Sequence, residues 1–79
     1  MTIKQKIYKI IGNQLGVEPQ NLKSEMLIKS DLNIDPLDLV DLISVLEEQF
    51  KIEISAGEAK KFETIGNIET YVLEKVNEI

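Results

Sequence analysis

The feature that most constrains this chain is a set of aliphatic side chains that return every three or four residues along three stretches. This spacing places them on one face of an α-helix, and it predicts helices over residues 3–15, 36–50 and 65–79. Each apolar face must be buried against another element, so the pattern favours an all-α bundle. The faces consist of Ile3, Ile7, Ile10, Ile11 and Leu15, then Leu39, Leu42, Ile43, Leu46 and Phe50, and finally Ile65, Ile68, Val72, Val76 and Ile79.

Capping residues predict where the first two of these helices begin and end. Thr2 followed by Gln5 three residues later is a capping box, and Gly16 is a natural stop just past the last periodic residue. Asp35 is a good N-cap for the second helix, and Pro36 suits its first position, where no amide hydrogen bond is lost. The lysines of the first helix, which lie off its apolar face, are Lys4, Lys6 and Lys9.

The C-terminal part of the chain predicts one short helix before the last long one. Residues 52–54 alternate in polarity, but no partner strand exists elsewhere, so we expect an extended linker there. Ser55 and Glu58 match a second capping box, which predicts a short helix that ends near Phe62. Thr64 is the expected cap of the last helix.

A long segment, residues 16–35, separates the first two helices and lacks a regular pattern. It is too apolar to be a disordered linker, so we expect its aliphatic side chains to pin it across the helices. These side chains are Val17, Leu22, Met26, Leu27, Ile28, Leu32 and Ile34. The prediction for residues 1–79 is therefore one all-α domain, a four-helix bundle with three main helices, one short third helix and a long loop between helices one and two.

Composition narrows the functions open to such a domain. With 79 residues and no cysteine, the fold depends on side-chain packing, without disulfides or thiolate metal sites. Fourteen acidic residues against nine basic ones give a net charge of −5, which disfavours nucleic acid and anionic membranes and favours partners with basic patches. No apolar run is long enough to span a membrane or act as a signal peptide, so we expect a cytoplasmic protein. Nothing in the sequence demands more than one copy, so we also expect a monomer.

Four short motifs, in order, resemble one known family. Residues 31–38 read D-L-N-I-D-P-L-D, which resembles the acyl carrier protein signature D-L-G-x-D-S-L-D. The run E-E-x-F-x-I-x-I-S from Glu47 to Ser55, the run T-I-x-x-x-x-x-Y from Thr64 and the run G-V-E-P-x-x-L from Gly16 are similar to the same family. Together they cover nearly the whole chain, and their shared order and spacing are specific although no single motif is decisive.

The resemblance implies a carrier of fatty-acid or polyketide-type biosynthesis, which presents thioester-bound acyl chains on a 4′-phosphopantetheine arm. In the family that arm is attached to the serine of D-S-L, whose hydroxyl attacks coenzyme A. Here Pro36 occupies that position and has no nucleophile, so no arm can be attached there and we expect no cofactor. Asn33 and Ile34 also depart from the family's glycine and small residue, which affects how a transferase would dock.

The alternative function is a working carrier. It requires either that another serine is modified in place of residue 36 or that a parent protein has serine at position 36. The other serines lack the D-S-L context: Ser30 and Ser24 lie in the long loop, Ser55 is a cap, and Ser44 is expected to be partly covered.

The acidic second helix has two readings of its own. It is a solvated helix face by default, whereas the resemblance implies that it binds basic surfaces of acyl-chain synthesis or transfer enzymes. The residues expected to bind such a partner are Asp35, Leu37, Asp38, Val40, Asp41, Glu47 and Glu48.

Catalysis by the chain itself is not expected. Histidine and cysteine are absent, and the carboxylates follow a helix face rather than converging on a pocket, so no catalytic residue is predicted. No dedicated metal site is predicted either; Asp31, Asp35 and Asp38 would offer at most weak calcium or magnesium association. We therefore expect a non-catalytic interaction module.

Overall fold

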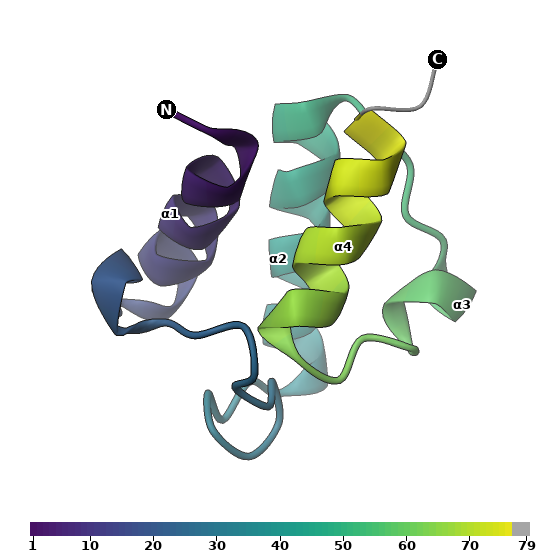
Figure 1. The fold of residues 1–79 in the computed structure, drawn as a ribbon. Coiled ribbons are helices and arrows are strands. Elements are labelled where there is room, and N and C mark those ends of the chain that lie inside the picture. Colours follow the sequence, from purple (N-terminus) through teal and green to yellow (C-terminus); the bar gives the residue numbers. More distant parts are fainter. Residues whose placement is uncertain (77–79) are drawn as a thin grey trace.

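The fold is a bundle of helices, seen in Figure 1, in which α1, α2 and α4 are the long elements and α3 is short. The computed structural model describes residues 1–76. Its elements are α1 (Ile3–Leu15), the 3-10 helix η1 (Pro19–Asn21), α2 (Pro36–Phe50), α3 (Ala56–Ala59) and α4 (Ile65–Val76). The predicted all-α class, with four α-helices and a long loop between the first two, is confirmed. The expected contact of Ile79 lies outside the described residues.

The predicted caps of the first two helices are present. The Thr2 hydroxyl accepts a hydrogen bond from the Gln5 backbone at 3.1 Å, and the Gln5 side chain accepts one from the Thr2 backbone at 2.8 Å. Gly16 ends α1 with φ 69°, the left-handed conformation that glycine adopts without steric cost. Helix α2 begins at Pro36 and ends at Phe50, as the spacing predicts.

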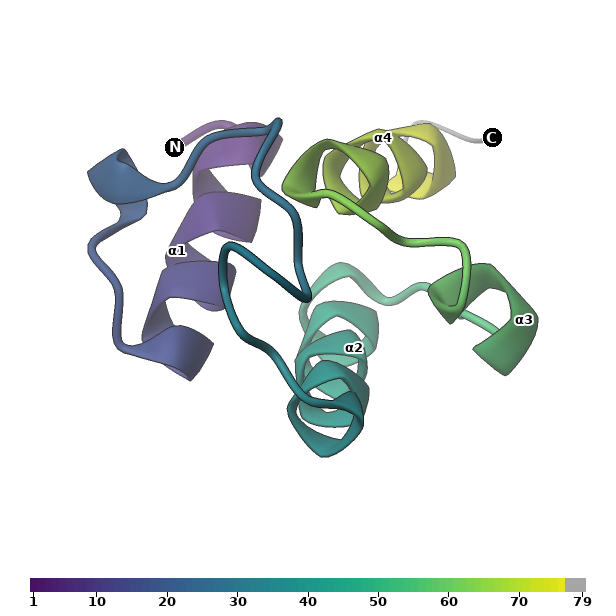
Figure 2. The same ribbon diagram turned by 90° about the horizontal axis from the view of Figure 1, so that it is seen from below.

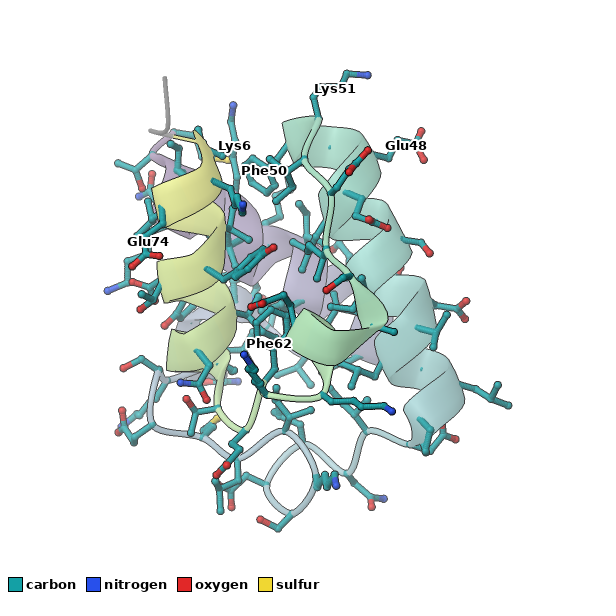
Figure 3. The ribbon with its side chains drawn as sticks, turned by 90° about the vertical axis from the view of Figure 1, so that its right-hand side faces the viewer. Lys6, Glu48, Phe50, Lys51, Phe62 and Glu74 are labelled. Carbon is teal, nitrogen blue, oxygen red and sulfur yellow. The ribbon has the colours of Figure 1, made fainter. Side chains whose placement is uncertain are left out.

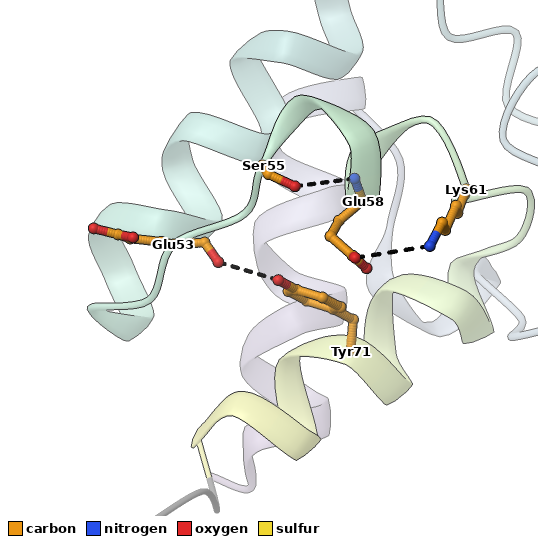
Figure 4. Close-up of polar contacts among 5 residues, drawn as sticks. All are labelled: Glu53, Ser55, Glu58, Lys61 and Tyr71. Atoms are coloured by element: carbon orange, nitrogen blue, oxygen red, sulfur yellow. Dashed lines mark hydrogen bonds and ion pairs between the residues drawn. The ribbon is translucent and has the colours of Figure 1, made fainter.

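Helix α3 is shorter than expected. The Ser55 hydroxyl accepts the Glu58 backbone N–H at 3.2 Å, but the Glu58 carboxylate lies 3.8 Å from the Lys61 ammonium instead of returning to Ser55 (Figure 4). Only half of the predicted capping box therefore forms. The helix ends at Ala59 because the next turns tighten: the backbone N–H groups of Lys61 and Phe62 bond three residues back, which brings the Phe62 ring into the core.

Helix α4 has the predicted cap and one partner that the sequence did not indicate. The Thr64 hydroxyl accepts the Asn67 backbone N–H at 3.1 Å, and the Asn67 side-chain oxygen accepts the Thr64 N–H at 2.9 Å. This reciprocal pair is a capping box with asparagine in place of the usual glutamate or glutamine. Asn67 also accepts the Glu63 N–H, so it holds the turn before the helix.

The long loop is fastened to the bundle as predicted. Its Ile28 N–H donates to Glu63 O at 2.9 Å, and its Met26 O accepts the Ile65 N–H at 3.1 Å, so it runs against the entry to α4 (Figure 2). One expected anchor is wrong: Leu27 is 44% exposed, because its backbone bridges to Thr64 while the neighbouring Ile28 side chain faces inward. The buried core comprises Ile7, Ile11, Leu22, Ile28, Ile34, Leu42, Ile43, Leu46, Ile54, Phe62, Ile65, Ile68 and Val72.

Candidate docking surface and attachment position at helix α2

A hydrogen-bonded turn in the loop, between Leu27 and Asp31, precedes the start of α2. The Asp31 carboxylate accepts the Leu27 N–H at 2.7 Å, and the Asp31 N–H donates to Leu27 O at 2.9 Å. Asn33 then adopts φ 54°, where L side chains are disfavoured and where the family signature has glycine. Asparagine tolerates this conformation better than most residues, so the loop keeps its course despite the substitution.

The N-terminus of α2 is capped by the residue before it. Asp35 Oδ1 accepts the Asp38 N–H at 2.8 Å, and Asp35 O accepts the Leu39 N–H at 3.0 Å. Pro36 lies between them at the first helical position, where its missing N–H costs no hydrogen bond. The carboxylates of Asp35 and Asp38 also lie at the positive end of the helix dipole, which stabilises the helix.

Pro36 is exposed at this helix terminus. A side chain with a hydroxyl at this position would be accessible to a modifying enzyme, but the pyrrolidine ring has no group that can form a phosphodiester. The start of α2 is therefore exposed at Pro36 but offers no nucleophile there.

The remaining serines differ in what they offer. Ser44 is exposed, so the prediction that it is partly covered is wrong. Its neighbour Ile43 faces the core, and one further step around the helix carries Ser44 to the outer side, on the same face as Leu37 and Val40. Ser55 is occupied as the cap of α3. Ser24 and Ser30 are exposed in the loop.

The outer face of α2 combines apolar and acidic side chains. Leu37 is 77% exposed and Val40 is 61% exposed, values that set them apart from the buried aliphatic residues of the same helix. Around them lie exposed acids, of which Glu48 points away from the bundle in Figure 3. We call this surface the α2 outer face; it consists of Leu37, Asp38, Val40, Asp41, Ser44 and Glu48.

Glu47 has a different environment from these acids. Its side chain is half-buried, and Oε2 accepts the Ile54 N–H at 2.8 Å. This bond joins the C-terminal part of α2 to the extended segment before α3. One carboxylate oxygen of Glu47 is thus committed to the fold, and the residue lies at the margin of the α2 outer face. The sequence offered no signal for this bond, which depends on how the linker returns.

A cavity of about 470 Å³ lies beside Pro36, between the loop, α2 and the segment after α3. Its apolar walls come from Ile28, Ile34, Leu39, Ala59 and Phe62. The sequence predicts Leu39 on a buried helix face and Ile28 and Ile34 as anchors of the loop. No local pattern indicates that Ala59, Lys60 and Phe62 close one side of a cavity, because that follows from the early end of α3.

The acidic residues at this end of the molecule do not converge on a metal site. The carboxylates of Asp31 and Asp35 each accept a backbone N–H, from Leu27 and Asp38 respectively. Within residues 1–76, no group of three acidic side chains is placed to hold a metal ion.

Comparison with known proteins agrees with this geometry. The family described as "Phosphopantetheine attachment site" matches residues 5–72. Acyl carrier proteins of Chlamydia muridarum (strain MoPn / Nigg) and Chlamydia trachomatis serovar D are each 40% identical over 77 residues, which cover 98% of this chain and 100% of the relative. A solved acyl carrier protein from Enterococcus faecalis superposes with a TM-score of 0.78 at 35% identity, covering 91% of both chains. A solved Mycobacterium tuberculosis structure reaches 0.86 at 29% identity, covering 91% of this chain and 96% of its own.

The helical bundle with an exposed, acidic helix start defines a carrier-type domain. The chain belongs to the acyl carrier protein family, as the resemblance of its motifs predicted. Members of this family carry acyl groups and do not catalyse reactions, so the chain is not an enzyme. Among residues 1–76, no helix has the length and apolar character needed to cross a membrane.

Proposed function

We propose that this chain is a non-catalytic docking module of fatty-acid or polyketide-type biosynthesis that bears no 4′-phosphopantetheine. The observation that carries the proposal is Pro36 at the exposed first position of α2, with the cap of Asp35 on Asp38 intact around it. Proline at this position supports the helix and removes the nucleophile, so covalent loading is lost while the fold and the α2 outer face are kept.

The α2 outer face is the surface we propose for docking, together with Asp35 and Glu47 at its margins. Its acids would steer a partner with a basic patch, because complementary charge chiefly raises association rates. Leu37 and Val40 would supply the apolar centre, since burying each exposed aliphatic side chain contributes about 1.5–3 kcal/mol. Expected partners are therefore basic surfaces of acyl-chain synthesis or transfer enzymes, in the cytoplasm.

Intact-mass measurement tests the absence of the arm. The protein is incubated with coenzyme A and a broad-specificity phosphopantetheinyl transferase, and no mass change is expected. Pro36→Ser, incubated in parallel, is expected to gain one phosphopantetheine. A gain by the unaltered protein would overturn the proposal. If neither protein is modified, the docking surface has diverged as well. That result would contradict the proposal that the α2 outer face is kept for docking.

Transferase kinetics on the Pro36→Ser background test the docking surface. Adding Leu37→Ser or Asp38→Asn with Asp41→Asn is expected to raise KM about tenfold, because contacts at the α2 outer face are lost. Leu27→Ser is the matched control, since Leu27 is also exposed but lies in the loop. Equal kinetics for the Leu37 and Leu27 variants would show that the face has no docking role.

A second candidate function is a working carrier loaded on another serine. The exposure of Ser44 on the α2 outer face is the observation that favours it. Peptide mapping after the transferase reaction distinguishes the two functions. Modification within α2 that disappears in Ser44→Ala would establish the carrier and exclude the docking-only role.

A further inference from the structure

Charge is segregated between two helices of this acidic molecule. Helix α1 carries three lysines and no acidic residue between Ile3 and Leu15, and all three lysines are exposed. Helix α2 carries four acidic residues and no basic residue between Pro36 and Phe50. The two helices present their outer surfaces on different sides of the bundle, as Figure 2 shows. Helix α1 therefore carries only positive charge and α2 only negative charge.

A groove of about 750 Å³ runs along α1. Its lysines are Lys4 and Lys9, and its apolar portions come from Met1, Tyr8 and Pro19. Met1 is 75% exposed, and the Lys4 ammonium lies 5.7 Å from the centroid of the Tyr8 ring. We call this the α1 groove. It offers apolar contact area beside two ammonium groups, which suits an anionic segment with apolar side chains.

We propose that the α1 groove binds the α2 outer face of a second copy of this chain. In this arrangement Leu37 and Val40 enter the groove, and the carboxylates of Asp38 and Asp41 meet the two lysines. The two lysines are about 7.5 Å apart along α1 and the two aspartates about 4.5 Å apart along α2, so forming both contacts relies on the reach of the long lysine side chains. The charge and apolar character that the groove requires are both present on the chain's own α2.

The association is weak and depends on salt. A net charge of −5 on each copy opposes it, so it needs the local attraction between the two helices. The two surfaces differ, so the contact is heterologous and each copy offers one of each kind. Because it covers the α2 outer face, self-association and docking to an enzyme exclude each other. Self-association goes beyond the proposed function, although it also uses the α2 outer face.

Sedimentation equilibrium over a range of protein concentrations tests the proposal. At about 10 mM salt the mean mass is expected to rise with concentration, and at about 1 M salt it is expected to remain that of a monomer, because the Debye length shrinks from about 30 Å to about 3 Å. Lys4→Gln with Lys9→Gln should abolish the rise. Lys23→Gln with Lys29→Gln, which changes net charge equally in the exposed loop, should keep it.

Mixing two variants distinguishes this contact from general attraction. Asp38→Asn with Asp41→Asn should be monomeric alone, and so should the Lys4 and Lys9 variant. Their mixture should recover a 1:1 pair, since one copy supplies an intact α2 and the other an intact α1. On a Pro36→Ser background, the variant with Lys4 and Lys9 replaced should still gain phosphopantetheine normally from the transferase. This measurement separates a failure of the self-association proposal from a failure of the docking proposal.

Three results would overturn the proposal. The first is a monomer at every concentration in low salt. The second is self-association that the Lys4 and Lys9 substitutions leave unchanged. The third is a monomer whose binding to anionic phospholipid vesicles falls in the lysine variant, which would assign the α1 groove to a lipid surface.

Discussion

The phenolic hydroxyl of Tyr8 on α1 donates a hydrogen bond to Glu69 Oε1 on α4 at 3.0 Å. Both side chains are half-buried, and the two residues, which are 61 positions apart in the sequence, join α1 to α4. Burial, together with the hydrogen bond to Glu69, raises the pKa of Tyr8 to about 12. This polar contact fixes how α1 lies against α4, next to the groove proposed for self-association.

Tyr8→Phe is expected to lower the free energy of unfolding by about 1 kcal/mol, because one partly buried hydrogen bond is lost and Glu69 loses its donor. Urea denaturation measures the change. Tyr71→Phe is the matched control: its hydroxyl donates to Glu53 O at 3.2 Å in an exposed position, so a smaller loss is expected (Figure 4). Equal losses would show that burial of the Tyr8 bond adds nothing.

Tyr8 also predicts a pH dependence at alkaline pH. The folded protein holds the phenolic proton more tightly than the unfolded chain, whose tyrosine pKa is near 10.0. The stability that Tyr8 contributes is therefore complete below pH 10 and falls as pH rises toward 12. The difference in unfolding free energy between the unaltered protein and Tyr8→Phe should shrink between about pH 10 and about pH 12. A constant difference would contradict the raised pKa.

Pro36→Ala is expected to destabilise the protein by about 0.4–1 kcal/mol, because the unfolded chain gains freedom that proline removes. Thermal or urea unfolding measures this, and the helix content by circular dichroism should not change. Leu37→Ala is the control, since its side chain is 77% exposed and should alter stability little. A gain in stability for the alanine variant would show that proline strains the start of α2.

Glu47→Ala is expected to increase hydrogen exchange at the Ile54 amide and to cost about 1 kcal/mol of stability, since the bond at 2.8 Å is lost. Glu48→Ala is the control on the exposed side of α2. Faster exchange limited to the Glu47 variant would establish the link between α2 and the segment before α3. Unchanged exchange would show that the linker is held by packing alone.

Asn33→Gly is expected to stabilise the protein by up to about 1 kcal/mol, whereas Asn33→Ala should destabilise it by about 1 kcal/mol. The reason is φ 54° at this residue, which glycine adopts freely and alanine does not. Asn13→Gly in α1 is the control: its backbone is helical, so glycine should cost roughly 0.3 kcal/mol there relative to asparagine. Opposite signs at the two positions are the expected result, measured by urea unfolding.

Local sequence signals predicted those parts of the fold that depend on neighbouring residues. The capping box of Thr2 and Gln5, the stop at Gly16 and the start of α2 at Pro36 are all confirmed. The reason is that caps and helical faces involve residues three or four positions apart, which the sequence places together directly. The four short motifs, taken together in their order, predicted the family because each of them is also local in the sequence.

Features that depend on distant segments were not predicted. The half-formed cap at Glu58, the early end of α3 at Ala59 and the exposure of Leu27 and Ser44 all depend on which neighbour occupies the adjacent space. A spacing pattern cannot specify that, because the bonding partner or covering surface is supplied by another part of the chain.

The sequence alone determined that Pro36 cannot carry a phosphodiester, since this depends only on the atoms of the side chain. It also determined that α2 would be acidic and α1 basic. Only the tertiary structure decided that Leu37 and Val40 are exposed while Glu47 is tied to Ile54, and that the Lys4 and Lys9 side chains line a groove. Covalent chemistry is a property of single residues, whereas a surface exists only after packing has chosen which faces are covered.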